Sequence, residues 1–95
     1  MKVVADSSPL IVLAKLNLFD LLSRLYPHVY ISAEVHAEVV VAGTGLPGAS
    51  GVANAEWIEV RPIKNPAQLA AAESEFNLGV GELSTIILAR ELGPI

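Results

Sequence analysis

The chain has 95 residues, of which 53% are hydrophobic and 17% charged, with a net charge of −4 and no cysteine. This length suits one small domain, and the missing cysteines exclude disulfide bonds and thiolate metal sites, so we expect a cytoplasmic protein. Six Lys and Arg residues exclude a broad basic surface for nucleic acid, but not a phosphate-handling site whose positive charge comes from divalent metal.

The first quarter of the chain predicts a strand followed by two helices. Residues 2–5 (KVVA) contain two β-branched valines and end at Asp-Ser-Ser-Pro, which favours a short buried strand. Ser8 as N-cap and Pro9 in the first helical position then predict a helix. A second helix is predicted over residues 17–25, with Asn17 as its cap.

The next part repeats the order of strand and helix. Residues 28–31 (HVYI) predict a second strand, after which Ser32 caps a helix that extends to about Ala42. Four glycines and a proline in residues 43–53 predict a loop with one helical turn near its end.

The last third predicts an edge strand and two further helices. Residues 56–63 alternate polar and apolar side chains and include Pro62, which suits an edge strand. Helices are predicted over residues 67–76, capped by Asn65, and over residues 80–92, where Gly93 and Pro94 stop the last helix. Strands separated by helices indicate an α/β fold with a short, mostly parallel sheet flanked by helices.

The chain has more apolar residues than is usual for a small domain, and no segment of it is suited to a membrane. Lys15, Asp20 and Arg24 interrupt the most apolar region, so no segment of the chain predicts a membrane span. A signal peptide is excluded by Asp6 and Pro9. The apolar surplus must lie in a core, at an interface between copies or against a partner, so we expect a homo-oligomer.

Two carboxylates stand out by their position in these elements. Asp6 follows the first strand at its carboxyl end, where ligand sites collect in α/β sheets. Glu38 shares a helical face with Val35 and Ala42, which directs it toward the packed side. The alternative interpretations are that Asp6 only caps the following helix and that Glu38 is solvated.

A third carboxylate, Glu82, lies at the head of the last helix. It aligns with Ile86 and Ala89 on the expected buried stripe, where a carboxylate needs a partner or a metal. The alternative is that Glu82 occupies a first turn simply because acids are favoured there. We interpret the remaining acids, Glu34 among them, as surface charges.

Three segments together carry a family resemblance: VVADSSPLIVLAKLNLFDLL (3–22), ISAEVHAEVV (31–40) and LGVGELSTIILARELG (78–93). They resemble the PIN-domain family, and more specifically its toxin-related branch of VapC-type ribonucleases. The resemblance implies a single PIN-like domain over residues 1–95. In that family the sheet continues into a strand after the last helix, so we expect this domain to be C-terminally incomplete.

The resemblance also implies an activity. It is that of a metal-dependent endoribonuclease of a toxin–antitoxin system, with Mg²⁺ or Mn²⁺ as cofactor, single-stranded RNA as substrate and an antitoxin as partner. Matched by position, Asp6, Glu38 and Glu82 are the catalytic metal ligands, and Ser7 supports Asp6 or a metal-bound water. The family's remaining acid lies beyond the end of this sequence. A second hypothesis therefore stays open, a catalytically dead PIN-like module that binds a partner protein or a second copy.

Overall fold

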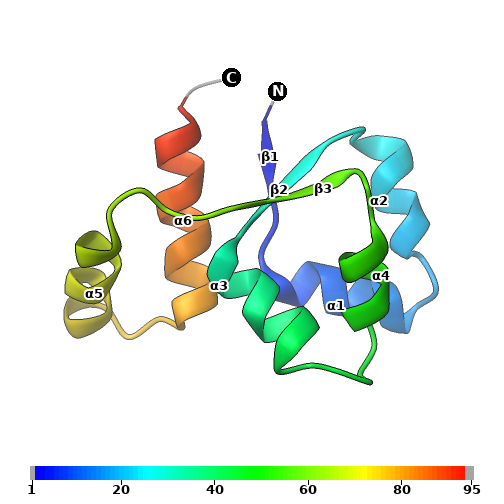
Figure 1. The fold of residues 1–95 in the computed structure, drawn as a ribbon, viewed down its shortest axis with the longest axis horizontal. Coiled ribbons are helices and arrows are strands. Elements are labelled where there is room, and N and C mark those ends of the chain that lie inside the picture. The colour runs from blue at the N-terminus through cyan, green and yellow to red at the C-terminus, as the bar shows by residue number, and fades with distance from the viewer. Residues whose placement is uncertain (1, 94–95) are drawn as a thin grey trace.

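The three strands form one parallel sheet. A computed structural model describes residues 2–93. Within them, β1 (Val3–Val4), β2 (Val29–Ser32) and β3 (Ile58–Arg61) pair in the order β1-β2-β3, all parallel (Figure 1). This arrangement confirms the predicted α/β fold and the edge position of the third strand.

The first helix, α1 (Ser7–Lys15), has a different cap from the one predicted. Asp6 has an extended backbone, with φ −85° and ψ 172°, and its carboxylate accepts a hydrogen bond from the Ser7 N–H. The prediction that Ser8 is the N-cap is therefore wrong. The cap and the candidate metal ligand are one residue, Asp6.

The second helix, α2 (Phe19–Leu25), begins later than predicted. Asn17 is not its cap but a left-handed loop residue with φ 57°. The Phe19 ring packs against Trp57, with ring centroids 5.3 Å apart. Three leucines of the predicted helix are nevertheless exposed: Leu18, Leu21 and Leu25.

The helix after β2 begins as predicted and then changes from α-helical to π-helical hydrogen bonding. Ser32 caps α3 (Ala33–His36), because its hydroxyl accepts a hydrogen bond from the Val35 N–H at 3.0 Å. The chain continues without a break into a π-helical turn, η1 (Ala37–Val41). The predicted length is confirmed, whereas the π turn, with its i→i+5 hydrogen bonds, was not expected.

The remaining helices match their predicted positions. The turn of helix expected late in the glycine-rich loop is α4 (Ala49–Asn54), and the two later helices are α5 (Pro66–Glu75) and α6 (Val80–Leu92). Gly93 ends α6 with φ 81°, a conformation that suits glycine. Pro94, which was also expected to stop this helix, lies outside the described residues.

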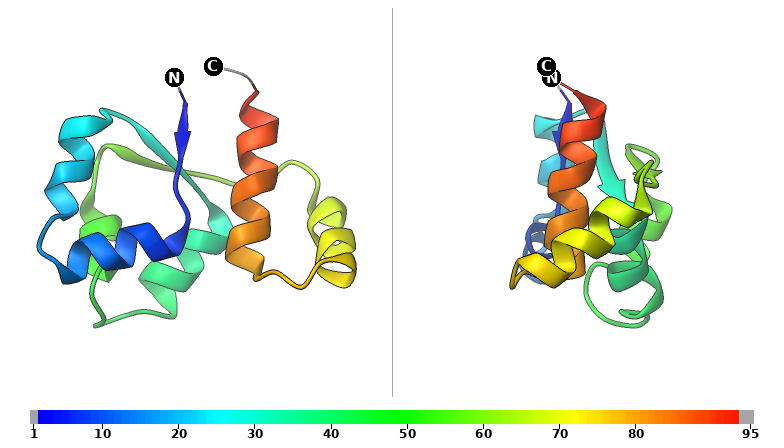
Figure 2. Two further views of the ribbon diagram at one scale, coloured as in Figure 1. Left: turned by 180° about the vertical axis from the view of Figure 1, so that it is seen from behind. Right: turned by 90° about the vertical axis from the view of Figure 1, so that its left-hand side faces the viewer.

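Two apolar cores lie on opposite faces of the sheet. The core beneath α1, α3, η1 and α4 is built from Leu10, Ile31, Val35, Val39 and Val52. The core of α5 and α6 is built from Ile63, Leu69, Leu83, Ile87 and Leu88. The left view of Figure 2 shows α5 and α6 on one side of the molecule and α1, α2 and α4 on the other. Within the part of the chain described here, no helix combines the length and apolarity that crossing a bilayer requires.

Helix α6 runs antiparallel to β1, and this places the candidate site. The Lys2 ammonium donates a hydrogen bond to the Leu92 carbonyl oxygen at 2.8 Å, so the start of β1 meets the end of α6. In Figures 1 and 2 these two ends lie together on one side of the molecule. At the other end, the buried hydroxyls of Ser32 and Ser84 lie 2.7 Å apart and tie β2 to α6. The carboxyl ends of β1 and β2 therefore face the head of α6.

Candidate metal centre

Asp6 and Glu38 meet through one shared hydroxyl. Asp6 follows β1, Ser7 is the first residue of α1 and Glu38 lies on η1. The Ser7 Oγ lies 3.2 Å from Glu38 Oε2 and 3.4 Å from Asp6 Oδ1. The Ser7 N–H also donates to Asp6 Oδ1 at 2.7 Å. Ser7 thus contacts both carboxylates, and its role in supporting Asp6 or a metal-bound water stays a prediction.

Gly81 leaves the space in which the two carboxylates lie. An ideal Cβ built on Gly81 would be 2.1 Å from Glu38 Oε1 and 3.3 Å from Asp6 Oδ1. The first distance is far inside van der Waals contact, so no side chain fits at this position with Glu38 where it is. We did not assign Gly81 a role from the sequence. The available signal was a glycine in the first turn of a helix, where it weakens the helix unless close packing requires it.

The two carboxylates lack a compensating cation in the described residues. The ion pairs of residues 2–93 both involve Glu59, which lies on β3. Lys15 lines a recess together with Glu38, but it forms no ion pair with it. Two carboxylates held close together repel each other, and a divalent cation between them would remove the repulsion. Mg²⁺ is commonly bound by one or two carboxylates with waters and phosphate oxygens, so Asp6 and Glu38 fit such an ion.

Glu82 does not lie on the buried face of α6. It is exposed, as are Ile86 and Ala89, so the predicted buried stripe is wrong. The buried face consists of Gly81, Leu83, Ser84, Ile87 and Leu88. Among residues 2–93, no group of three or more metal-ligating side chains is assembled. The structure therefore brings Asp6 and Glu38 together without Glu82, whose role as a ligand stays a prediction.

Glu38 reaches the site from an exposed position. The prediction that it lies on the packed side with Ala42 is wrong, because both residues are exposed. The buried positions of this segment are Val35 and Val39. Glu38 lies beside that stripe, and its carboxylate still reaches Ser7 and the space above Gly81.

Glu34 is a further carboxylate whose environment differs from the one predicted from the sequence. It was interpreted as a surface charge, but the structure places it half-buried at the start of α3. Its Oε1 atom is buried and has no hydrogen-bond partner among the described residues. The sequence marks Glu34 only as an acid in the first turn of the helix capped by Ser32, and the packing of this helix against α6 is seen only in the structure.

The comparison with protein families agrees with the α/β fold. A family model, DUF3368, described as a PIN domain, matches residues 2–95. No curated protein and no solved structure matches the chain. The family match includes all three segments that carry the resemblance seen in the sequence.

Proposed function

The chain belongs to the PIN-domain family, and we propose that it is a metal-dependent endoribonuclease of the toxin–antitoxin type, similar to VapC. The observation that carries this proposal is the convergence of Asp6 and Glu38 on Ser7, above the bare backbone of Gly81. The proposed substrate is single-stranded RNA, and the proposed site of action is the cytoplasm. An antitoxin and a second copy of the chain are the proposed protein partners.

The residues of the site have separable roles. Asp6 uses Oδ1 for its hydrogen bonds within the described residues, which leaves Oδ2 for an ion. Glu38 accepts from Ser7 through Oε2, while its Oε1 lies above Gly81. We propose Glu82 as a third ligand, because it follows Gly81 at the head of α6. When bound, Mg²⁺ or Mn²⁺ supplies Lewis acidity and lowers the pKa of a water that attacks the phosphodiester.

The substitution Asp6→Asn tests the proposal. Asparagine caps helices as well as aspartate does, so α1 keeps its start while the site loses one negative charge. We expect the affinity for Mn²⁺, measured by titration calorimetry, to fall by at least about tenfold, and cleavage of single-stranded RNA to disappear.

The matched control is Asp20→Asn. Asp20 is an exposed acid in the first turn of α2, so this substitution makes the same charge change away from the site. We expect it to leave metal affinity and cleavage unchanged. Equal Mn²⁺ affinity in the two variants, or a wild-type protein that binds no metal, contradicts the proposal.

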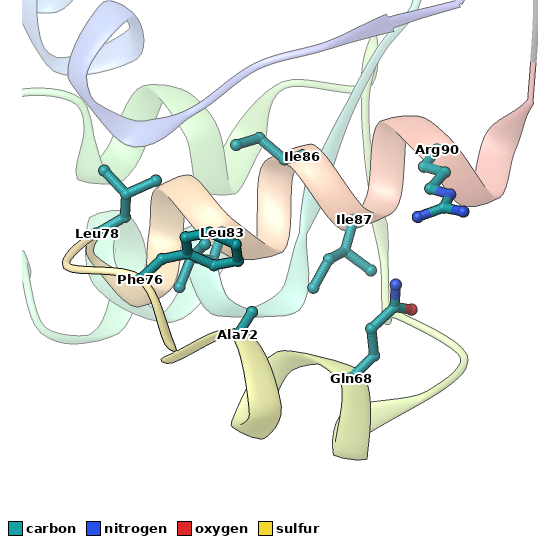
Figure 3. A pocket seen from close by; sticks show the side chains of 8 residues that line it. All are labelled: Gln68, Ala72, Phe76, Leu78, Leu83, Ile86, Ile87 and Arg90. Atoms are coloured by element: carbon teal, nitrogen blue, oxygen red, sulfur yellow. The ribbon is translucent and has the colours of Figure 1, made fainter. Parts of the chain in front are cut away.

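A groove between α5 and α6 favours the second hypothesis, a partner-binding module. The groove has a volume of about 350 Å³ and is mostly apolar, with Gln68 and Arg90 at one end (Figure 3). Phe76 and Ile86 line it and are 52% and 59% exposed. Sedimentation analysis of Ile86→Ser tests this module, with Val12→Ser on α1 as control because Val12 is 51% exposed and lies outside the groove. Self-association or antitoxin binding lost only in Ile86→Ser supports it, whereas identical behaviour of the two variants contradicts it.

A further inference from the structure

Half of the basic residues of this acidic chain line a single recess. The chain has six Lys and Arg residues and a net charge of −4. Lys2, Arg61 and Lys64 all line a recess of about 220 Å³, where the start of β1, the exit of β3 and the end of α6 meet. We call this the basic recess. It lies at the opposite end of β1 and α6 from Asp6 and Glu38.

The negative groups of the basic recess already have hydrogen bonds. Both carboxylate oxygens of Glu91 accept a hydrogen bond from the backbone N–H of Lys64, at 2.9 and 3.0 Å. The Leu92 carbonyl oxygen accepts from the Lys2 ammonium. Within residues 2–93, no carboxylate lies at ion-pair distance from either lysine. An ammonium group has three N–H donors, and Lys2 uses one of them on the Leu92 carbonyl oxygen, so both lysines keep N–H donors for an anion.

Arg61 is held in place before any ligand arrives. Its Nε atom donates to Glu59 Oε2, and the guanidinium carbon lies 5.3 Å from the centre of the Tyr30 ring. The side chain is still 45% exposed. An arginine fixed in this way loses little conformational freedom on binding, and its planar N–H groups match the oxygens of a phosphate.

We propose that the basic recess binds a backbone phosphate of single-stranded RNA at a distance from the acid pair. This inference rests on the proposed nuclease function. Gly81 and Leu92 lie at the two ends of α6, which separates the acid pair from the recess by about 16 Å, at roughly 1.5 Å per residue. An RNA strand that occupies both places runs along α6 and β1, and is anchored outside the site where it is cut.

Binding of RNA without metal separates this anchor from catalysis. The probe is a fluorescent oligoribonucleotide of about 12 nucleotides in EDTA, followed by anisotropy across a range of salt concentrations. We expect Lys2→Gln/Lys64→Gln to bind it about tenfold more weakly than wild type. The slope of log affinity against log salt should fall by about 1.4, because two fewer phosphate contacts form on a single strand.

The control carries the same change of charge elsewhere. Arg24→Glu lowers the net charge by the same two units at one exposed position on α2. We expect its affinity to stay within about twofold of wild type, since Arg24 does not line the recess. Equal weakening by both variants, at unchanged thermal unfolding midpoints, shows a general charge effect and overturns the inference. Inorganic phosphate that binds the recess as tightly as the oligonucleotide overturns it too, because the ligand is then a small phosphate compound.

Metal-dependent cleavage tests the nuclease proposal, whereas RNA binding in EDTA tests the recess. If Asp6→Asn abolishes cleavage while Lys2→Gln/Lys64→Gln binds RNA like wild type, the recess inference is wrong and the nuclease stands. If the recess variant loses RNA in EDTA while wild type cleaves nothing with Mn²⁺, the recess is supported and the nuclease proposal is wrong.

Discussion

The substitution Gly81→Ala adds a single methyl group at the point where the two carboxylates meet. An ideal Cβ at this position would lie 2.1 Å from Glu38 Oε1 and 3.1 Å from Glu38 Cδ. The Glu38 carboxylate is the far end of a flexible, exposed side chain. We therefore expect Glu38 to rotate away while the backbone of α6 stays where it is.

The effects on folding nearly cancel, whereas the effect on the site does not. Alanine in place of glycine stabilises a helix by up to about 1 kcal/mol. Rotation of Glu38 breaks its partly buried hydrogen bond from Ser7, which costs about 1 kcal/mol. The free energy of unfolding should thus stay within about 1 kcal/mol of wild type. The affinity for Mn²⁺ should fall by at least about tenfold, or roughly 1.4 kcal/mol, because one of the two converging carboxylates has left.

Titration calorimetry with Mn²⁺ and chemical denaturation measure these two quantities. Gly79→Ala is the control, since an ideal Cβ there meets nothing closer than Glu82 Oε1 at 3.8 Å. Because Gly79 is the N-cap of α6, its replacement is expected to cost up to about 1 kcal/mol of stability and to leave metal affinity unchanged. If Gly81→Ala binds Mn²⁺ as tightly as wild type, the space above Gly81 is not part of a metal site.

Two further predictions concern the fold and its surface. Ser32→Ala should lower the free energy of unfolding by about 2 kcal/mol, because it removes the cap of α3 and the partner of a buried hydroxyl. Ser84→Ala removes no cap, so denaturation should show a loss of about 1 kcal/mol; equal losses contradict this division. For Glu59, the hydrogen bond from Arg61 lowers the carboxyl pKa below its ordinary value of 4.5. Its stabilising contribution is therefore present above pH 4.5 and is lost as pH falls through the lowered pKa. NMR titration of Arg61→Gln should show the Glu59 pKa moving back up, and an unchanged pKa contradicts the assigned cause.

Several features of the fold were predictable because their causes are local. The β-branched run at residues 2–5, the Ser32 cap and the pattern of residues 80–92 each specify an element through neighbouring residues alone. The alternation of strands with helices then requires parallel pairing. The parallel sheet, the Ser32 cap of α3 and the extent of α6 confirm these predictions.

Other predictions were wrong because two local options competed. Ser8 and Asp6 are both good N-caps, and only the extended backbone of Asp6 decides between them. The buried stripe of α6 was placed on the face of Glu82 and Ile86, although helical periodicity fits more than one face of such an apolar helix. The face that is buried depends on how α6 packs against the sheet, and that face includes Ser84.

The sequence by itself determined the class of fold, the family and the presence of Asp6 and Glu38 as candidate ligands, since these depend on patterns along the chain. Only the tertiary structure decided which side chains meet, because the meeting of Asp6 with Glu38 depends on how η1 and α6 lie against the end of β1. The same packing leaves Glu82 exposed and places Gly81 where a side chain would collide with the Glu38 carboxylate. The physical reason is distance: contacts between residues far apart in the chain are set by the arrangement of elements, which local propensity does not encode.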